Sequence, residues 1–504
     1  MVLDLWAEYA KTCSCRIALR AGGSSLSVSQ SSFFSSVRAA MPGQCPDKEK
    51  NVFKRKPTFR SSGKRSSGLS VVALLLILGV AGAGAWFLMR DLRGPEVSVS
   101  PSASRVGFSQ PLEVSVSDKS GVQSVTVSVK RGSQSMVVKQ ETYAVLEKSR
   151  TVSFDLKDTR LPEGSFELEV RAFDGSYAGF GKGNSTTFSK PMVLDSKPPR
   201  IAVKTVPPSV HRGGSALIVY TLSEEVVKTG VRVGDFFFPG YRQENGGYAC
   251  LFAFPVTMRA DAYHPEIMAQ DKAGNITSSR LLVRAMNKNY RADTLNIPES
   301  FLNYKANELA QLCPDKDTPL EQYLCANSKV RAANDAKLIE LAADPGNVTP
   351  RFVWEGPFRR LPRSAVKASF GDHRTYVDGH RSKIDEQTHM GIDLASVAQA
   401  PIPASAAGRV IWADYLGIHG HMVLIDHGLG LMTQYSHLTD YKVNVGDVVK
   451  AGDIVGTTGV SGLAGGDHLH FGVLVGGVPV QPLEWLDSSW VKNNITSRLN
   501  TNVK

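Results

Sequence analysis

The stretch "GGDHLHFGV", Gly465–Val473, decides how the C-terminal part of the chain folds, because histidines alternate with apolar residues along it. A period of two predicts a β-strand. Alternate residues of a strand lie on one face, about 6.6 to 6.8 Å apart. His468 and His470 are therefore expected to point into one site. Strand spacing alone leaves open whether both bind a metal, one binds and one catalyses, or both are structural.

The surrounding segment, residues 350–487, has β composition and many glycines. Seven of the chain's eleven histidines lie from His389 to His470, which points to chemistry in this region. No cysteine follows residue 325, so a metal site here has to use nitrogen and oxygen ligands.

Two further motifs supply such ligands. "THMGIDLA" places Asp393 four residues after His389, and Gly391 between them lets the backbone pass closely. "TQYSHLTD" adds His437 in another apolar strand context. Two histidines, one carboxylate and a water form the open coordination of a catalytic zinc ion. Further histidines beside the metal can accept a proton and stabilise an oxyanion.

The order "HMGID", "YSHL", "HLH" resembles the lysostaphin/LytM-type zinc metallopeptidases, which are peptidoglycan endopeptidases. The resemblance covers about residues 350–487. Supporting stretches are "FGDHR", "AAGRVIWAD", "VNVGDVVKAGDIVGTTGVSG" and "PLEWL".

This resemblance implies a role for each matching residue. His389, Asp393 and His470 correspond to the ligands of one zinc ion, and His437 and His468 to the residues that act on the attacking water and the tetrahedral intermediate. The implied fold is a small, mostly antiparallel β structure with a groove along its sheet. The implied substrate is peptide in bacterial peptidoglycan.

The sequence also departs from the family pattern. "TYVDGHRSKIDEQT" is expected to form a loop at the groove edge, and "GIHGH" replaces a common glycine–asparagine pair. Arg374 is interpreted equally as a contact for a substrate carboxylate or as a surface cation. The remaining histidines are expected at the surface or behind the ligands, with His421 the candidate to line the groove: His373, His380, His419, His421 and His427.

An uncharged run of 21 residues, Leu69–Met89, is long enough to predict a transmembrane anchor. Eight Lys and Arg residues stand between positions 48 and 65, which predicts a cytoplasmic N-terminus and an exported remainder in a single-pass inner-membrane protein. A cleavable signal peptide is the alternative. Residues 1–68 are interpreted as a disordered basic tail, with translation starting at Met41.

Between anchor and peptidase domain, the chain is predicted to be mainly β. Alternating apolar and polar residues with regular turns predict two tandem immunoglobulin-like β-sandwiches, 95–195 and 196–286, with a single irregular β domain as the alternative. Residues 298–345 have helical composition and are interpreted as a connector, and 488–504 as a C-terminal tail.

The cysteines after residue 90 suggest one disulfide. Cys313 and Cys325 flank a short helix-like segment and are expected to pair, which leaves Cys250 as a buried free thiol. The net charge of +11 favours anionic surroundings, but no nucleic-acid motif is present.

Together these observations favour a membrane-anchored zinc endopeptidase of peptidoglycan stem-peptide crosslinks. A non-catalytic regulator that activates a cell-wall amidase is the main alternative, and a protease for proteins is a third. The β-sandwiches are candidate contacts for other cell-wall enzymes, and they are a candidate cover for the groove.

Overall fold

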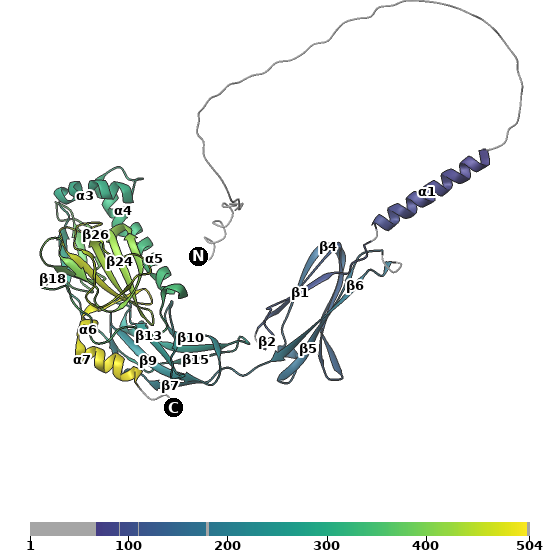
Figure 1. The fold of residues 1–504 in the computed structure, drawn as a ribbon, viewed down its shortest axis with the longest axis horizontal. Helices are drawn as coiled ribbons and strands as arrows, with labels where there is room; N and C mark the ends of the chain where they lie inside the picture. Colours follow the sequence, from purple (N-terminus) through teal and green to yellow (C-terminus); the bar gives the residue numbers. More distant parts are fainter. Residues whose placement is uncertain (1–66, 90, 109, 178–180, 501–504) are drawn as a thin grey trace, which may run out of the picture. The chain divides into compact units, whose positions relative to one another are not determined.

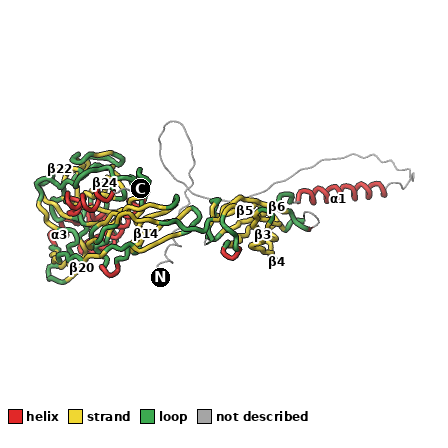
Figure 2. The backbone as a smooth tube through the Cα atoms, turned by 90° about the horizontal axis from the view of Figure 1, so that it is seen from below, coloured by secondary structure: helices red, strands yellow, loops and turns green. Residues whose placement is uncertain are grey.

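The computed structural model describes residues 67–89, 91–108, 110–177 and 181–500 (Figure 1). The predicted basic tail lies outside the described residues except at its last two positions, and so does the proposed start at Met41. Strands dominate the described chain, with helices at its start and in its C-terminal half (Figure 2).

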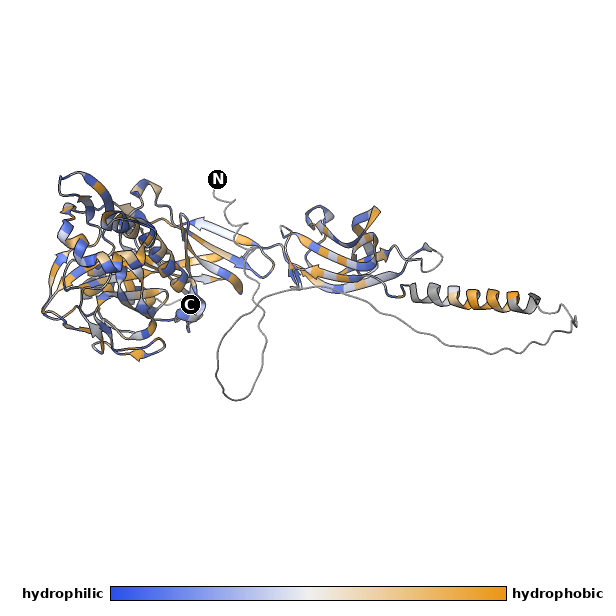
Figure 3. Cartoon of the chain, turned by 90° about the horizontal axis from the view of Figure 1, so that it is seen from above, coloured by the Kyte–Doolittle hydropathy of each residue, from blue (hydrophilic) through white to orange (hydrophobic). Residues whose placement is uncertain are grey.

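The predicted anchor coincides with helix α1, Ser67–Met89, whose middle is apolar (Figure 3). Among the helices that the structure describes, however, none is both long and apolar enough to cross a membrane. By this finding, the predicted single-pass inner-membrane location is wrong.

The first β domain is one six-stranded sheet with its own core of valine and leucine. The strand order is β1-β3-β5-β6-β2, and β4 pairs with β3. Burial alternates along β5, because successive side chains of a strand point to opposite faces. The immunoglobulin-like prediction is not confirmed here. The strands are β1 Glu96–Ser100, β2 Arg105–Val106, β3 Leu112–Arg131, β4 Gln134–Phe154, β5 Gly164–Asp174 and β6 Ser185–Leu194.

The second β domain has two four-stranded sheets, ordered β11-β10-β14-β15 and β12-β13-β9-β7. Cys250 lies on β13 as a buried free thiol, as predicted. An immunoglobulin-like identity stays a prediction for this domain as well. The strands are β7 Ile201–Thr205, β9 Ser215–Leu222, β10 Val226–Val233, β11 Phe236–Pro239, β12 Tyr241–Arg242, β13 Tyr248–Ala253, β14 Glu266–Asp271 and β15 Ile276–Arg280.

The segment predicted as a helical connector contains α3 Glu299–Leu312, α4 Pro319–Cys325, the π-helical turn η4 Ala326–Val330 and α5 Arg331–Ala343. Thr318 caps α4 in a reciprocal capping box with Glu321. The predicted disulfide between Cys313 and Cys325 is present and joins the end of α3 to the end of α4.

The C-terminal domain is built on an eight-stranded sheet, ordered β18-β21-β29-β25-β24-β23-β27, with β30 paired to β29. Strands β25 and β29 are buried along their whole length. The strands are β18 Ala365–Ala368, β21 Ile392–Ala395, β23 Gly408–Tyr415, β24 His421–Gly428, β25 Leu431–Leu438, β27 Val448–Val449, β29 Leu469–Val475 and β30 Val478–Val480.

Both faces of this sheet are covered, which explains the continuous burial. On β24, Val423 and Ile425 pack into a core that also contains residues of the second β domain. Met422 and Leu424 point to the other face and pack against Leu338 and its neighbours on α5. In Figure 1, α5 lies beside the strands of this domain. The central strands are therefore held between two layers.

A half-buried carboxyl group lies where the second β domain meets the C-terminal domain. Glu484, on helix α6 (Pro482–Leu486), accepts a hydrogen bond from the Ser215 backbone N–H at 3.3 Å. Burial raises the pKa of Glu484 to about 7. Its neutral form is therefore favoured in the folded protein.

This pKa predicts a pH-dependent stability. Because the folded pKa exceeds the ordinary carboxyl value of 4.5, the stabilisation by Glu484 is complete below about pH 4.5 and is lost as the pH rises through about 7. Between pH 4.5 and 8, the free energy of unfolding of the wild type should fall by on the order of 3 kcal/mol more than that of Glu484→Gln. Thermal unfolding of both proteins across this pH range measures the difference. If the stability of the two proteins depended on pH in the same way, this prediction would be wrong.

Candidate metal centre

Three neighbouring strands bring the predicted site residues together. In the antiparallel pairing of β21 with β29, Asp393 lies directly opposite His470. On the other side of β29, His470 is paired with Ser436 of β25, and His437 is the next residue along that strand. His468 immediately precedes β29, and His389 lies in the loop that leads into β21.

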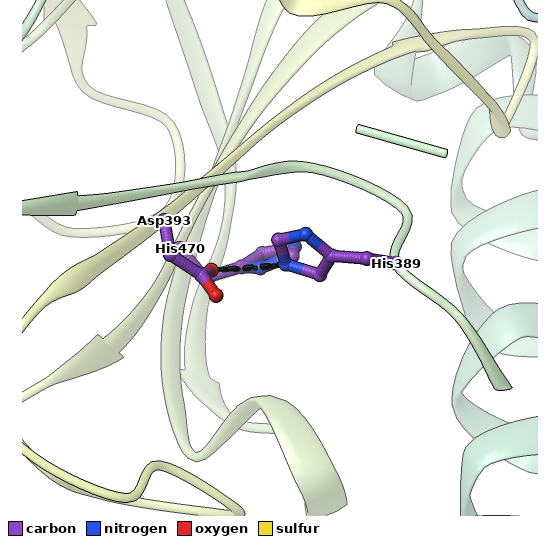
Figure 4. Close-up of side chains that lie close together, drawn as sticks. All are labelled: His389, Asp393 and His470. Carbon is purple, nitrogen blue, oxygen red and sulfur yellow. Dashed lines mark hydrogen bonds and ion pairs between the residues drawn. The ribbon is translucent and has the colours of Figure 1, made fainter. Parts of the chain in front are cut away.

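The atoms of the three predicted ligands converge on one point (Figure 4). His389 Nε2 lies 3.0 Å from Asp393 Oδ1 and 3.1 Å from His470 Nδ1. His470 Nδ1 lies 3.0 Å from the same carboxylate oxygen. Two imidazole nitrogens and one carboxylate oxygen fit a zinc ion that keeps an open coordination position.

Neighbouring groups orient two of these ligands. His389 Nδ1 donates to the carbonyl oxygen of Ser369 at 2.9 Å, which directs the unprotonated Nε2 to the cluster. Arg374 donates from Nη2 to Asp393 Oδ2 at 3.1 Å. The sequence offered a substrate contact or a surface cation for Arg374, but here its guanidinium holds the carboxylate.

The electrostatics favour the protonation states that metal binding requires. Burial alone would raise the pKa of Asp393, but the adjacent imidazoles of His389, His468 and His470 hold it well below its usual value. Burial lowers the pKa of His470 to about 4, although Asp393 acts in the opposite direction. At neutral pH the carboxylate is therefore charged and the His470 imidazole is neutral.

His437 and His468 face each other beside the cluster, with ring centroids 4.9 Å apart. His437 Nδ1 donates to the Ser461 carbonyl oxygen at 2.8 Å, and His468 Nδ1 donates to that of Gly466 at 2.7 Å. Since a carbonyl only accepts, each Nδ1 carries the hydrogen. His437, the penultimate residue of β25, has a left-handed φ of 65°, a strained conformation for a non-glycine residue that is enriched at functional sites.

The other histidines divide into buried and peripheral groups. His427 is buried between the Ala407 carbonyl and the Thr433 hydroxyl, and His421 contacts the Tyr441 hydroxyl. His419, rather than His421, lines the cavity at the cluster, with its ring centroid 6.1 Å from that of His470. Its Nε2 is buried and has no hydrogen-bond partner among the described residues. His373 and His380 are exposed.

The cluster opens into a cavity of about 600 Å³ whose walls come partly from the helical segment. Phe301, Tyr323 and Arg331 line it together with His468 and His470. The sequence motifs give no sign of these wall residues, because they lie more than fifty residues before the first histidine motif.

The cluster, the two facing histidines and the adjoining cavity define a metallopeptidase-type domain. Residues 387–482 match Peptidase family M23, and this part of the chain is an M23 domain. The resemblance to lysostaphin-type peptidases is thereby confirmed.

Named relatives match over stretches of 87 to 96 residues. The chain is 36% identical over 95 residues to DD-carboxypeptidase/endopeptidase Mpg of Neisseria meningitidis, covering 19% of this chain and 22% of Mpg. It is 35% identical over 96 residues to peptidoglycan DD-endopeptidase ShyC of Vibrio cholerae, covering 19% and 22%. It is 37% identical over 87 residues to lysostaphin of Staphylococcus simulans, covering 16% and 17%. The chain thus spans less than a quarter of each relative's length.

A steric prediction tests the cluster. A Cβ at Gly391 would lie 2.6 Å from His470 Nε2 and 2.7 Å from the Phe471 carbonyl oxygen. Gly391→Ala should therefore displace His470, destabilise the fold by about 1 to 3 kcal/mol, and reduce bound zinc. Thermal unfolding and metal analysis measure both effects. Gly379→Ala, with nothing within 4 Å of its added Cβ, is the matched control. Equal values for the two variants would refute the proposed crowding.

Proposed function

We propose that this protein is a zinc endopeptidase that hydrolyses peptide bonds in peptidoglycan, with stem-peptide crosslinks as the substrate. The observation that carries the proposal is the convergence of His389, Asp393 and His470 within hydrogen-bonding distance, next to His437 and His468. The similarity to ShyC, which is named as a peptidoglycan endopeptidase, supports the substrate class.

In this proposal His389, Asp393 and His470 hold one zinc ion. When bound, zinc would polarise the scissile carbonyl and make water acidic enough to attack at neutral pH. Arg374 would keep the Asp393 carboxylate in place. The buried surroundings would exclude bulk water and strengthen each electrostatic contact.

His437 and His468 would handle the proton and the developing charge. Burial and the neighbouring His468 and His470 hold the pKa of His437 well below its usual value, so its Nε2 carries no proton. The same shift weakens it as a base, and it would therefore accept a proton only from water that bound zinc has made more acidic. Burial opposes protonation of His468, but Asp393 outweighs it and raises the His468 pKa. His437 is thus suited to be the general base and His468 to stabilise the oxyanion.

The direct test is digestion of purified peptidoglycan by the full-length, zinc-loaded protein, with fragments and new termini identified by mass spectrometry. Wild type should release peptides cut at crosslinks. Absence of new termini from a folded, zinc-loaded protein would overturn the proposal. Enhancement of a separate amidase without new termini would instead favour the regulator, and equal cleavage of an unrelated protein would favour a general protease.

Two substitutions, one in β29 and one just before it, separate the proposed roles. His470→Ala should lose bound zinc and activity together, because it removes a ligand. His468→Ala should keep most of the zinc and lose at least about a hundredfold in kcat. Metal analysis and peptide-release rates measure the two effects, with the exposed His380→Ala as control. Loss of zinc from His468→Ala, or retention of zinc by His470→Ala, would contradict the assignment of His470 as the ligand and His468 as the catalytic residue.

A further inference from the structure

Helix α3 contacts the C-terminal domain through a partly buried ion pair whose two residues lie outside the M23 match. Lys305 is 3% exposed, and its ammonium group pairs with Glu308 Oε2 at 2.7 Å. The same ammonium donates to the carbonyl oxygen of Val460, and Glu308 Oε1 accepts from the Gly462 N–H at 2.9 Å. A buried ammonium needs such partners, because desolvation without them is costly.

The residue between these two contacts is Ser461. Its carbonyl oxygen is the acceptor for His437 Nδ1. The Ser461 carbonyl and the Gly462 N–H belong to one planar peptide group. Glu308 therefore binds the N–H end of the same peptide group whose oxygen end binds His437. Lys305 holds the preceding peptide group by its oxygen.

Other contacts restrict the same turn. The Ser461 hydroxyl donates to the Leu438 carbonyl at 2.8 Å and accepts from the His421 N–H at 2.9 Å. Gly462 has a φ of +67°, and a Cβ there would lie 2.4 Å from the Ile418 carbonyl oxygen. Contacts of the Ser461 hydroxyl and close packing at Gly462 thus restrict the turn, in addition to its contacts with α3.

We propose that Lys305 and Glu308 are positioning residues that fix the orientation and tautomer of His437 through the Ser461–Gly462 peptide group. A carboxylate at the N–H end polarises the peptide group and makes its carbonyl a stronger acceptor. That acceptor keeps the hydrogen on His437 Nδ1 and leaves Nε2 free toward the cavity. The helical segment thereby becomes part of the catalytic apparatus, although it touches no reacting atom.

The test uses the full-length protein with variants that leave no unpaired buried charge. In the background Lys305→Met, Glu308→Gln keeps an acceptor for the Gly462 N–H, and Glu308→Ala removes it. The Ala variant should have a kcat about tenfold below that of the Gln variant, with KM within about twofold and equal zinc content. A structural role alone would lower the melting temperature without this kcat difference. Equal kcat values, or a change confined to KM, would overturn the proposal.

Two controls isolate the peptide contact. Glu308 also lies next to the Tyr415 hydroxyl, so Tyr415→Phe removes that contact alone and should leave kcat unchanged. Glu299→Ala removes a charge from the exposed start of the same helix and should also have no effect. If either control lowers kcat as much as Lys305→Met/Glu308→Ala does, the assignment to the Gly462 contact is wrong.

The kinetic readout rests on the proposed peptidase function, so a second readout is independent of activity. Spectra of ¹⁵N-histidine-labelled protein, with His437 assigned through His437→Gln, report its tautomer directly. Wild type should show the Nδ1–H form, and Lys305→Met/Glu308→Ala should show a mixture. A tautomer change without any wild-type cleavage would retain this inference and reject the proposed function. An unchanged tautomer would reject this inference.

Discussion

The pairing of β21 with β29 is the constraint on which the site depends. Antiparallel register sets Asp393 opposite His470, so a carboxylate and an imidazole from distant parts of the chain share one face. A slip of one residue would turn one of them to the opposite face and dismantle the cluster. The alternating apolar residues prevent such a slip, because it would move Leu394 and Phe471 out of the core.

Burial on both faces gives this register its rigidity. The central strands lie between the core shared with the second β domain and the helix α5. The same burial sets the electrostatics, because it lowers the pKa of His437 and His470 while the hydrogen bonds of Asp393 keep that carboxylate charged. Burial of the central strands therefore both fixes the strand register and lowers the pKa of the site histidines.

The sequence predicted what local motifs encode. The family resemblance carried by three short motifs predicts one cluster of His389, Asp393 and His470, and the cysteine positions predict the disulfide and the buried thiol of Cys250. Contacts between distant segments were not predictable. Lys305 and Glu308 resemble an ordinary i,i+3 surface pair until the fold places Gly462 beside them.

Of the remaining expectations, one was left open, one is not confirmed and one is wrong, each for a different reason. The role of Arg374 was left open, because nothing in its local sequence shows that Asp393 will lie beside it. Alternating strands predicted β structure for residues 95–195, but a period of two does not say whether strands form one sheet or two. Hydropathy over Leu69–Met89 predicted an inner-membrane location that the described helices do not support.

The C-terminal domain shares its apolar core with the second β domain, so the core does not end where the family match ends. The M23 match covers residues 387–482, yet Leu217 and Phe252 before it and Ile495 after it belong to the same apolar cluster as Val423 and Phe471. A fragment cut at residue 350 would leave one side of its sheet facing water where β9 and β13 now lie. The apolar core of this domain therefore extends well beyond the residues that match the family.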